Sequence, residues 1–187
     1  MTILEEIAEY TKARIEKEKK QISTNELRTL AEKMNENEGF VFEDAIRNSD
    51  NMAFICECKK ASPSKGIIAN EFPYVDIALE YEAAGADAIS VLTEPKWFLG
   101  SNSYLEEISM TVKIPCLRKD FTIDPFMIYE AKVIGAKAIL FICSLLDTKT
   151  LNEYIQIADA LSLSHIVEAH DEKEIESAMN AGARIIG

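Results

Sequence analysis

The sequence has few residues that break regular structure: seven glycines and five prolines among 187 residues. This scarcity excludes a collagen-like or low-complexity chain. The sequence also lacks an apolar run of about 18 residues, so no membrane partner is expected. Its first residues are acidic and periodic rather than basic and then apolar, which is unlike a secretory signal peptide.

Positive charge is in the minority. The chain has 20 Lys and Arg against 32 Asp and Glu, a formal net charge of −12. Binding to a nucleic-acid backbone needs clustered basic residues, so no nucleic-acid partner is expected. A small phosphorylated substrate remains compatible with this charge, because such a substrate needs only a few local cations.

Metal-binding patterns are also missing. The cysteines are Cys56, Cys58, Cys116 and Cys143, and the histidines are His165 and His170. The cysteines contain no C-x-x-C pair, and the histidines lie far from them in sequence, so no metal site is expected. Free core thiols in a reducing, cytoplasmic environment are the simpler interpretation.

The sequence does contain enough apolar residues for one sizeable core, since 48% of it is hydrophobic. An apolar stripe that begins at Ile3 and a capping box that begins at Ser23 predict two helices near the N-terminus. A polar break follows at residues 35–39. We therefore predict an N-terminal helical extension over residues 1–50.

Beyond residue 51, short apolar runs alternate with amphipathic stretches. The expected strands cover residues 53–58, 88–92, 114–117, 138–143, 164–169 and 184–187. The expected helices cover residues 75–84, 104–111, 125–134, 148–161 and 172–180, with Asp147 and Asp171 as N-caps. This alternation is typical of βα units with a parallel sheet.

An internal repeat favours a barrel. Gly85, Gly135 and Gly182 each end a helix and precede an Ala and a strand, once every two βα units. Alternate strands fill the interior layers of a (β/α)₈ barrel, which explains such a period. A doubly wound sheet is the alternative, but no G-x-G-x-x-G follows any strand. We predict an α/β fold, a (β/α)₈ TIM barrel of which residues 51–187 form about strands 1–6.

Charged residues near strand ends are the strongest functional signal, because burying a charge costs several kcal/mol unless it is paired or used. Glu57 and Lys59 share one face of the first strand. Lys119 ends the third strand, and Glu168 lies near the end of the fifth. A barrel builds its active site at the carboxyl ends of its strands. The alternative is ordinary surface charge on exposed strands.

Two loops add weaker signals. Residues 61–66 combine small residues, hydroxyls and a lysine, which suit a phosphate contact but are also common in ordinary loops. Trp97 and Phe98 lie side by side after the second strand, where they either pack in the core or line an aromatic-ring site.

Together these motifs resemble the indole-3-glycerol phosphate synthase family. The matching motifs are E-x-K-K-A-S-P-S-K-G at 57–66, T-E-x-x-x-F-x-G-S at 93–101, L-R-K-D-F at 117–121 and V-E-A-H at 167–170. The resemblance implies a carbon–carbon carboxy-lyase of tryptophan biosynthesis that uses no cofactor or metal. Its implied substrate is 1-(2-carboxyphenylamino)-1-deoxyribulose 5-phosphate, which closes to an indole ring with loss of carbon dioxide and water.

The resemblance also implies a role for each matching residue. Lys119 would be the general acid that activates the ketone, and Glu168 the partner acid/base in the dehydration. Lys59 would bind anionic groups and share in proton transfer, while Glu57 would hold the ammonium groups and a substrate hydroxyl. The implied pocket residues are Ser62 and Pro63 at the substrate loop, and Phe98, Phe121 and Leu140 around the anthranilate ring.

The chain stops at Gly187, within the sixth expected strand, whereas such a barrel needs eight strands and about 250 residues. We expect a piece of a longer product, in which case the isolated chain lacks most of the phosphate site. If the end is genuine, open barrel edges predict self-association. Two other functions stay open: a non-catalytic half-barrel that acts by association, and another sugar-phosphate lyase that uses a Schiff-base lysine.

Overall fold

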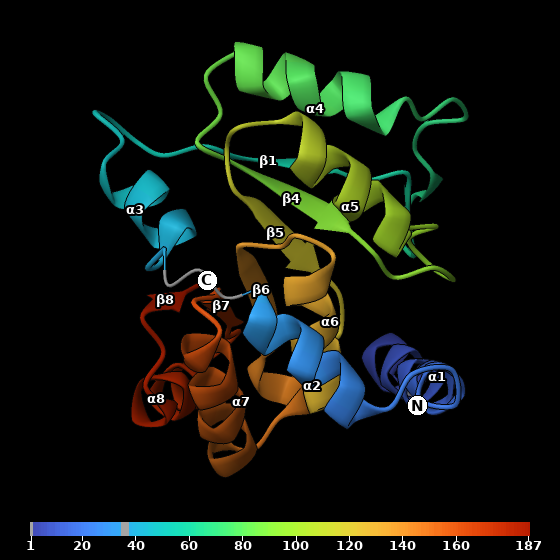
Figure 1. Cartoon of the computed structure of the whole chain (residues 1–187), viewed down its shortest axis with the longest axis vertical. Coiled ribbons are helices and arrows are strands. Elements are labelled where there is room, and N and C mark those ends of the chain that lie inside the picture. Colours follow the sequence, from blue (N-terminus) through green and yellow to red (C-terminus); the bar gives the residue numbers. More distant parts are fainter. Residues whose placement is uncertain (1, 35–37) are drawn as a thin grey trace. The chain divides into compact units, whose positions relative to one another are not determined.

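The computed structural model of the chain describes residues 2–34 and 38–187 (Figure 1). Its helices are α1 (Ile3–Glu18), α2 (Thr24–Lys33), α3 (Val41–Arg47), α4 (Tyr74–Ala83), α5 (Asn102–Thr111), α6 (Pro125–Val133), α7 (Thr148–Ala160) and α8 (Glu172–Ala181). Its strands are β1 (Ile55–Cys58), β2 (Ala61–Ser62), β3 (Gly66–Ile67), β4 (Ala88–Leu92), β5 (Cys116–Lys119), β6 (Ala138–Ile142), β7 (Ser164–Glu168) and β8 (Ile185–Ile186). The polar break predicted at 35–39 begins outside the described residues.

The main sheet has six strands in the order β1-β4-β5-β6-β7-β8. The pairs β1–β4, β4–β5 and β7–β8 are parallel. A helix lies between each strand of this order and the next along the chain. The predicted α/β fold, with six barrel strands in this chain, is therefore confirmed.

A short antiparallel hairpin, β2 with β3, replaces the loop expected after β1. Gly66, the first residue of β3 after the turn, has a φ of +63°, a conformation that L residues rarely adopt. The two strands are only two residues long each, which is too short for a periodic pattern to reveal them in the sequence.

The chain divides into two compact units. Of the described residues, unit 1 comprises 2–34, 38, 121–133 and 139–187, and unit 2 comprises 39–120 and 134–138. The predicted boundary between a helical extension and a barrel near residue 50 stays a prediction.

In unit 1, both N-terminal helices begin with capping boxes. Ser23 and Glu26 exchange hydrogen bonds at the start of α2, as predicted, and Thr2 and Glu5 do the same for α1. Helix α2 packs on α6 (Figure 1). The predicted N-caps Asp147 and Asp171 begin α7 and α8 and accept backbone N–H bonds.

In unit 2, helices α4 and α5 pack on the parallel strands β1, β4 and β5 (Figure 1). All five residues of β4 are buried, and four of them are apolar, as expected for a strand of a parallel sheet. On β1, Cys58 is buried while Glu57 is only partly exposed. Glu57 is therefore the partly exposed neighbour of a buried thiol at the carboxyl end of β1.

The cysteines are free thiols, and Cys58, Cys116 and Cys143 are buried. Burial raises the pKa of Cys58 and of Cys116 to about 12. Within residues 2–34 and 38–187, no three His, Cys, Asp or Glu side chains are grouped so that they could hold a metal ion. No helix in the same residues is long and apolar enough to span a membrane.

Candidate active site

The carboxyl end of β1 carries a close ion pair. Lys59 Nζ donates to Glu57 Oε1 at 2.5 Å, and both side chains are about one-third exposed or less. Ser90 on β4 donates its hydroxyl to the other Glu57 oxygen at 3.3 Å. The two charged groups predicted on one strand face therefore do meet, with their ends accessible to a ligand.

Tyr81 on α4 forms a hydrogen bond with the end of β1. Its hydroxyl donates to the backbone carbonyl of Glu57 at 3.5 Å. Burial is the main cause that raises the pKa of the Tyr81 phenol, so it remains a donor at neutral pH. This hydrogen bond links α4 to the residue that carries the Glu57 carboxylate.

Lys119 ends β5 in the same unit, and its side chain is partly exposed. Its register partner is Leu92 at the end of β4, and its carbonyl accepts the Thr93 N–H at 3.1 Å. Because β1, β4 and β5 are parallel neighbours, Glu57, Lys59 and Lys119 all belong to the carboxyl-terminal edge of this part of the sheet.

Buried polar residues flank Lys119 on both sides along the chain. Arg118 Nε donates to Thr93 Oγ1 at 3.2 Å, and Thr93 Oγ1 donates to Asp120 Oδ2 at 2.8 Å. A second guanidinium nitrogen of Arg118 donates to Asn102 Oδ1 at 3.0 Å. This network joins the ends of β4 and β5 to the start of α5, and no motif in the sequence predicted it.

The remaining predicted residues of unit 2 lie in the connections that follow β1 and β4. Ser62 is in β2, and Pro63 follows it in the hairpin turn. The Ser62 hydroxyl accepts the Lys65 N–H at 3.3 Å. Phe98 is partly buried in the segment between β4 and α5. Phe98 therefore lies in the connection expected from the sequence, whereas Ser62 and Pro63 belong to the hairpin that replaces the expected loop.

In unit 1, Glu168 ends β7, and its carboxylate lies 3.1 Å from His170 Nε2. The His170 side chain is 68% exposed. His165, at the other end of the strand region, is fully buried. Leu140 is buried in β6, and Phe121 is partly exposed just after β5.

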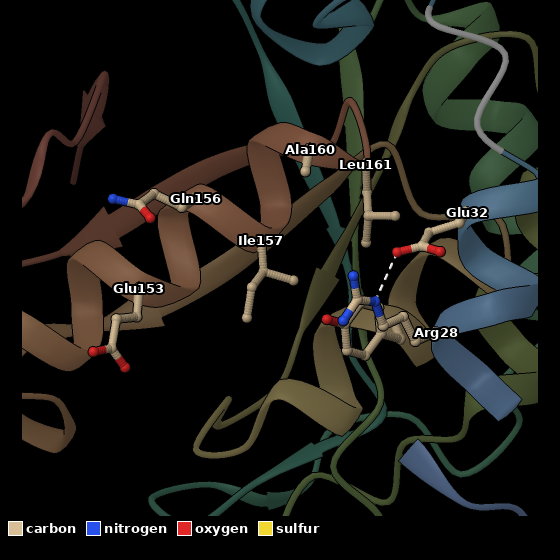
Figure 2. Close-up of a pocket in the computed structure, with 8 residues that line it drawn as sticks. Arg28, Glu32, Glu153, Gln156, Ile157, Ala160 and Leu161 are labelled. Carbon is tan, nitrogen blue, oxygen red and sulfur yellow. Dashed lines mark hydrogen bonds and ion pairs between the residues drawn. The ribbon is translucent and has the colours of Figure 1, made fainter. Parts of the chain in front are cut away.

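A groove elsewhere in unit 1 contains none of the predicted site residues (Figure 2). It has a volume of about 440 Å³ and is bounded by residues of α2, α6 and α7. Arg28 and Glu32 lie on its α2 side and form an ion pair at 2.7 Å. The candidate site therefore lies at the ends of the strands and not in this groove.

Parallel βα units with lysines and carboxylates at the carboxyl ends of their strands define an enzyme of the α/β-barrel class. The sequence matches the family model described as indole-3-glycerol phosphate synthase over residues 4–187. The chain belongs to the indole-3-glycerol phosphate synthase family, whose members are decarboxylating lyases of tryptophan biosynthesis. This membership supports indole-ring closure over both alternatives left open by the sequence.

Curated relatives with the same name support the family assignment. The chain is 58% identical to the protein of Ruminiclostridium cellulolyticum and 52% identical to that of Endomicrobium trichonymphae. Each match covers 99% of this chain and 71% of the relative. A protein of Lachnoclostridium phytofermentans is 44% identical, with 72% of its length covered.

Solved structures match at lower similarity. A chain from a structural study of a Schiff-base-forming fructose-1,6-bisphosphate aldolase has a TM-score of 0.47 at 16% identity. That match covers 78% of this chain and 67% of the other. A likeness this distant supports no conclusion about function.

Proposed function

We propose that this chain acts on 1-(2-carboxyphenylamino)-1-deoxyribulose 5-phosphate and closes it to indole-3-glycerol phosphate. The observation that carries the proposal is the presence of Glu57, Lys59 and Lys119 at the carboxyl edge of three neighbouring parallel strands. The reaction requires an acid, a base and cations for an anionic substrate, and these residues supply such groups.

The first step joins carbon to carbon. Lys119 donates a proton to the ketone oxygen of the substrate, which makes the carbonyl carbon more electrophilic. The ring carbon that bears the carboxylate attacks this carbon. Carbon dioxide then leaves, and the electrons of the broken bond restore the aromatic ring.

The second step removes water. Glu168 accepts a proton from the methylene carbon beside the ring nitrogen, and the new hydroxyl leaves as water after it receives a proton. Lys59 shares in this proton transfer, because its ammonium group is an acid that Glu57 holds in place at 2.5 Å. The resulting double bond completes the indole.

Substrate binding uses the surrounding residues. Lys59 attracts the anionic groups, and Glu57 orients the lysine and a substrate hydroxyl. The proposed pocket consists of Ser62, Pro63, Phe98, Phe121 and Leu140. Apolar side chains among these would hold the aromatic ring, because flat apolar surfaces bury well against each other.

The finer assignments also remain proposals. We place the protein among the carbon–carbon carboxy-lyases, with residues 1–50 as a helical extension and residues 51–187 as barrel. A biosynthetic role of this kind, together with free buried thiols, supports a cytoplasmic location.

The test replaces the proposed acid. We expect Lys119→Met to lower kcat by about 10²–10⁴-fold, the usual contribution of a general acid. Product is followed by indole fluorescence, with Lys113→Met as the control because Lys113 is exposed on the connection before β5. Wild-type turnover in Lys119→Met would remove Lys119 from the mechanism. If the wild-type chain forms no product while the R. cellulolyticum relative does, the proposed activity of this chain is wrong.

A further inference from the structure

The segment between β4 and α5 is organised around one buried carboxylate. Glu94 is fully buried. Its Oε1 accepts the backbone N–H of Lys96 at 2.9 Å, and its Oε2 accepts those of Trp97 at 2.7 Å and Phe98 at 3.0 Å. One side chain thus satisfies three successive backbone donors of the segment.

At the end of the same segment, the backbone of Gly100 packs closely against the backbone of Leu92. Gly100 donates its N–H to the carbonyl of Glu94 at 2.8 Å. A Cβ at Gly100 would lie 2.3 Å from the carbonyl oxygen of Leu92, so only glycine fits there. Leu99 adopts a φ of +50°, in the left-handed region that non-glycine residues rarely occupy. The segment is therefore held in one specific conformation.

The start of the segment is joined to the strand that ends in Lys119. Thr93 donates its backbone N–H to the Lys119 carbonyl and its hydroxyl to Asp120. Glu94 follows directly in the chain. The Glu94 carboxylate therefore links the backbone of Phe98 to Thr93, which is hydrogen-bonded to the end of β5.

These contacts determine where Phe98 lies. Hydrogen bonds to an ionised carboxylate are shorter and stronger than neutral ones. Without the carboxylate, three backbone donors of this partly buried segment would lose their acceptor, and the segment would relax. Phe98 would then leave its position, although its own side chain is unchanged.

We propose that Glu94 is a positioning residue that holds Phe98 where it packs against the aromatic ring of the substrate. The inference rests on the proposed function, since that function supplies the ring. Glu94 itself touches no reacting atom. It acts by fixing the backbone of residues 96–98.

Trp97 provides the first test, because it is the only tryptophan and belongs to the same segment. In Glu94→Gln, an amide NH₂ replaces one acceptor oxygen, so at least one of the three backbone donors loses its partner. We expect a several-fold increase in acrylamide quenching of Trp97 fluorescence. The matched control is Glu106→Gln, because Glu106 is an exposed residue of α5 in the same unit. We expect this control variant to leave the quenching of Trp97 unchanged. Unchanged quenching in Glu94→Gln would overturn the proposal.

The second test is a double-mutant cycle with a ligand that cannot cyclise. The probe is the substrate with its ketone reduced to an alcohol, and calorimetry measures its Kd. We expect Glu94→Gln and Phe98→Ala each to weaken binding about tenfold, and the double variant to bind no more weakly than Phe98→Ala alone. Additive losses would show that Glu94 does not act through Phe98, and would overturn the inference.

Gly100→Ala tests the same idea without altering Glu94. The new methyl group displaces the segment from the Leu92 carbonyl, so the loss of affinity should again disappear in a Phe98→Ala background. If Glu94→Gln fails to fold, Gly100→Ala still tests whether the conformation of the segment affects binding through Phe98. Additive losses here would equally overturn the inference.

Failure of the proposed function gives a different result. In that case the wild-type chain does not bind the reduced substrate, while Trp97 quenching still increases in Glu94→Gln. The role of Glu94 in ordering the segment would then stand, and its link to the substrate ring would be wrong.

Discussion

Arg118 is the largest fully buried side chain among the described residues. Its guanidinium lies 3.6 Å from the equally buried Asp120 carboxylate and donates to Thr93 and Asn102. A buried charge is tolerated only when its donors and acceptors are paired, so each member of this network depends on the others.

Removal of the Arg118 charge should therefore be costly. We expect Arg118→Met to lower the free energy of unfolding by about 3–5 kcal/mol, because Asp120 loses its buried partner. Urea denaturation followed by circular dichroism measures this change. Arg47→Met is the control, since Arg47 is 73% exposed and its ion pair is 3.9 Å long, so its cost should stay within about 0.5 kcal/mol. Equal costs for the two variants would contradict the prediction.

Cys116 should make stability depend on alkaline pH. Burial raises its pKa from 9.0 to about 12, so between these values the unfolded chain loses a proton that the folded chain keeps. The unfolded state then binds fewer protons, and stability falls by up to about 1.4 kcal/mol per pH unit.

The measurement for Cys116 is the free energy of unfolding as a function of pH. We expect Cys116→Ala to flatten the decline above pH 9, although the variant is less stable at neutral pH because a small cavity remains. Cys56→Ala, at a partly exposed position, is the control. A slope in Cys116→Ala that is as steep as in the wild-type chain would disprove the thiol effect.

At the scale of elements, the repeated glycines act through the backbone. Gly135 and Gly182 have φ values of +88° and +91°, and both follow a helix. The space around them differs. A Cβ at Gly182 meets nothing within 4 Å, whereas a Cβ at Gly135 would lie 2.4 Å from Ser109 Oγ.

The two glycines therefore predict unequal costs for the same substitution. Gly182→Ala should lower the free energy of unfolding by about 1–2 kcal/mol through backbone strain alone. Gly135→Ala should cost more, because the hydroxyl of Ser109 must also move. In a Ser109→Ala background, Gly135→Ala should lose only as much unfolding free energy as Gly182→Ala, because the hydroxyl that must move is absent. Equal losses at both glycines, measured by urea denaturation, would show that the close contact has no effect.

Most elements could be predicted because their signals are local. Ser23, Asp147 and Asp171 are N-caps whose side chains bond within their own first turn. The hairpin of β2 and β3 could not be predicted, since four residues in two short strands carry no period. The end of β5 at Lys119 agrees with the expectation that charged residues close this strand, although its apolar run ends at Leu117.

At the scale of the whole molecule, the edge of the sheet at β1 is the feature with a testable consequence. In the described part of the chain, β1 pairs with β4 and lies at one end of the strand order. Phe54, just before β1, is 59% exposed. Exposed edges with apolar side chains favour association.

We therefore expect the average sedimenting mass of the 187-residue chain to rise with concentration. Phe54→Lys should reduce this rise, since a charge on an edge opposes pairing. Met110→Lys is the control, because Met110 is 73% exposed on α5. A mass that stays at 20.9 kDa at all concentrations would show that the predicted self-association is wrong.

Sequence alone determined the order of the six main strands and of the helices between them, the caps at Ser23, Asp147 and Asp171, the glycines that end helices and the family. These features depend on neighbours within a few residues or on motifs with fixed spacing, such as the residues from Glu57 to Gly66. Tertiary structure decided which polar residues are buried and which groups they form hydrogen bonds with. The roles of Glu94 and Arg118 depend on contacts with the ends of neighbouring strands, and burial of that kind exists only once the sheet has formed.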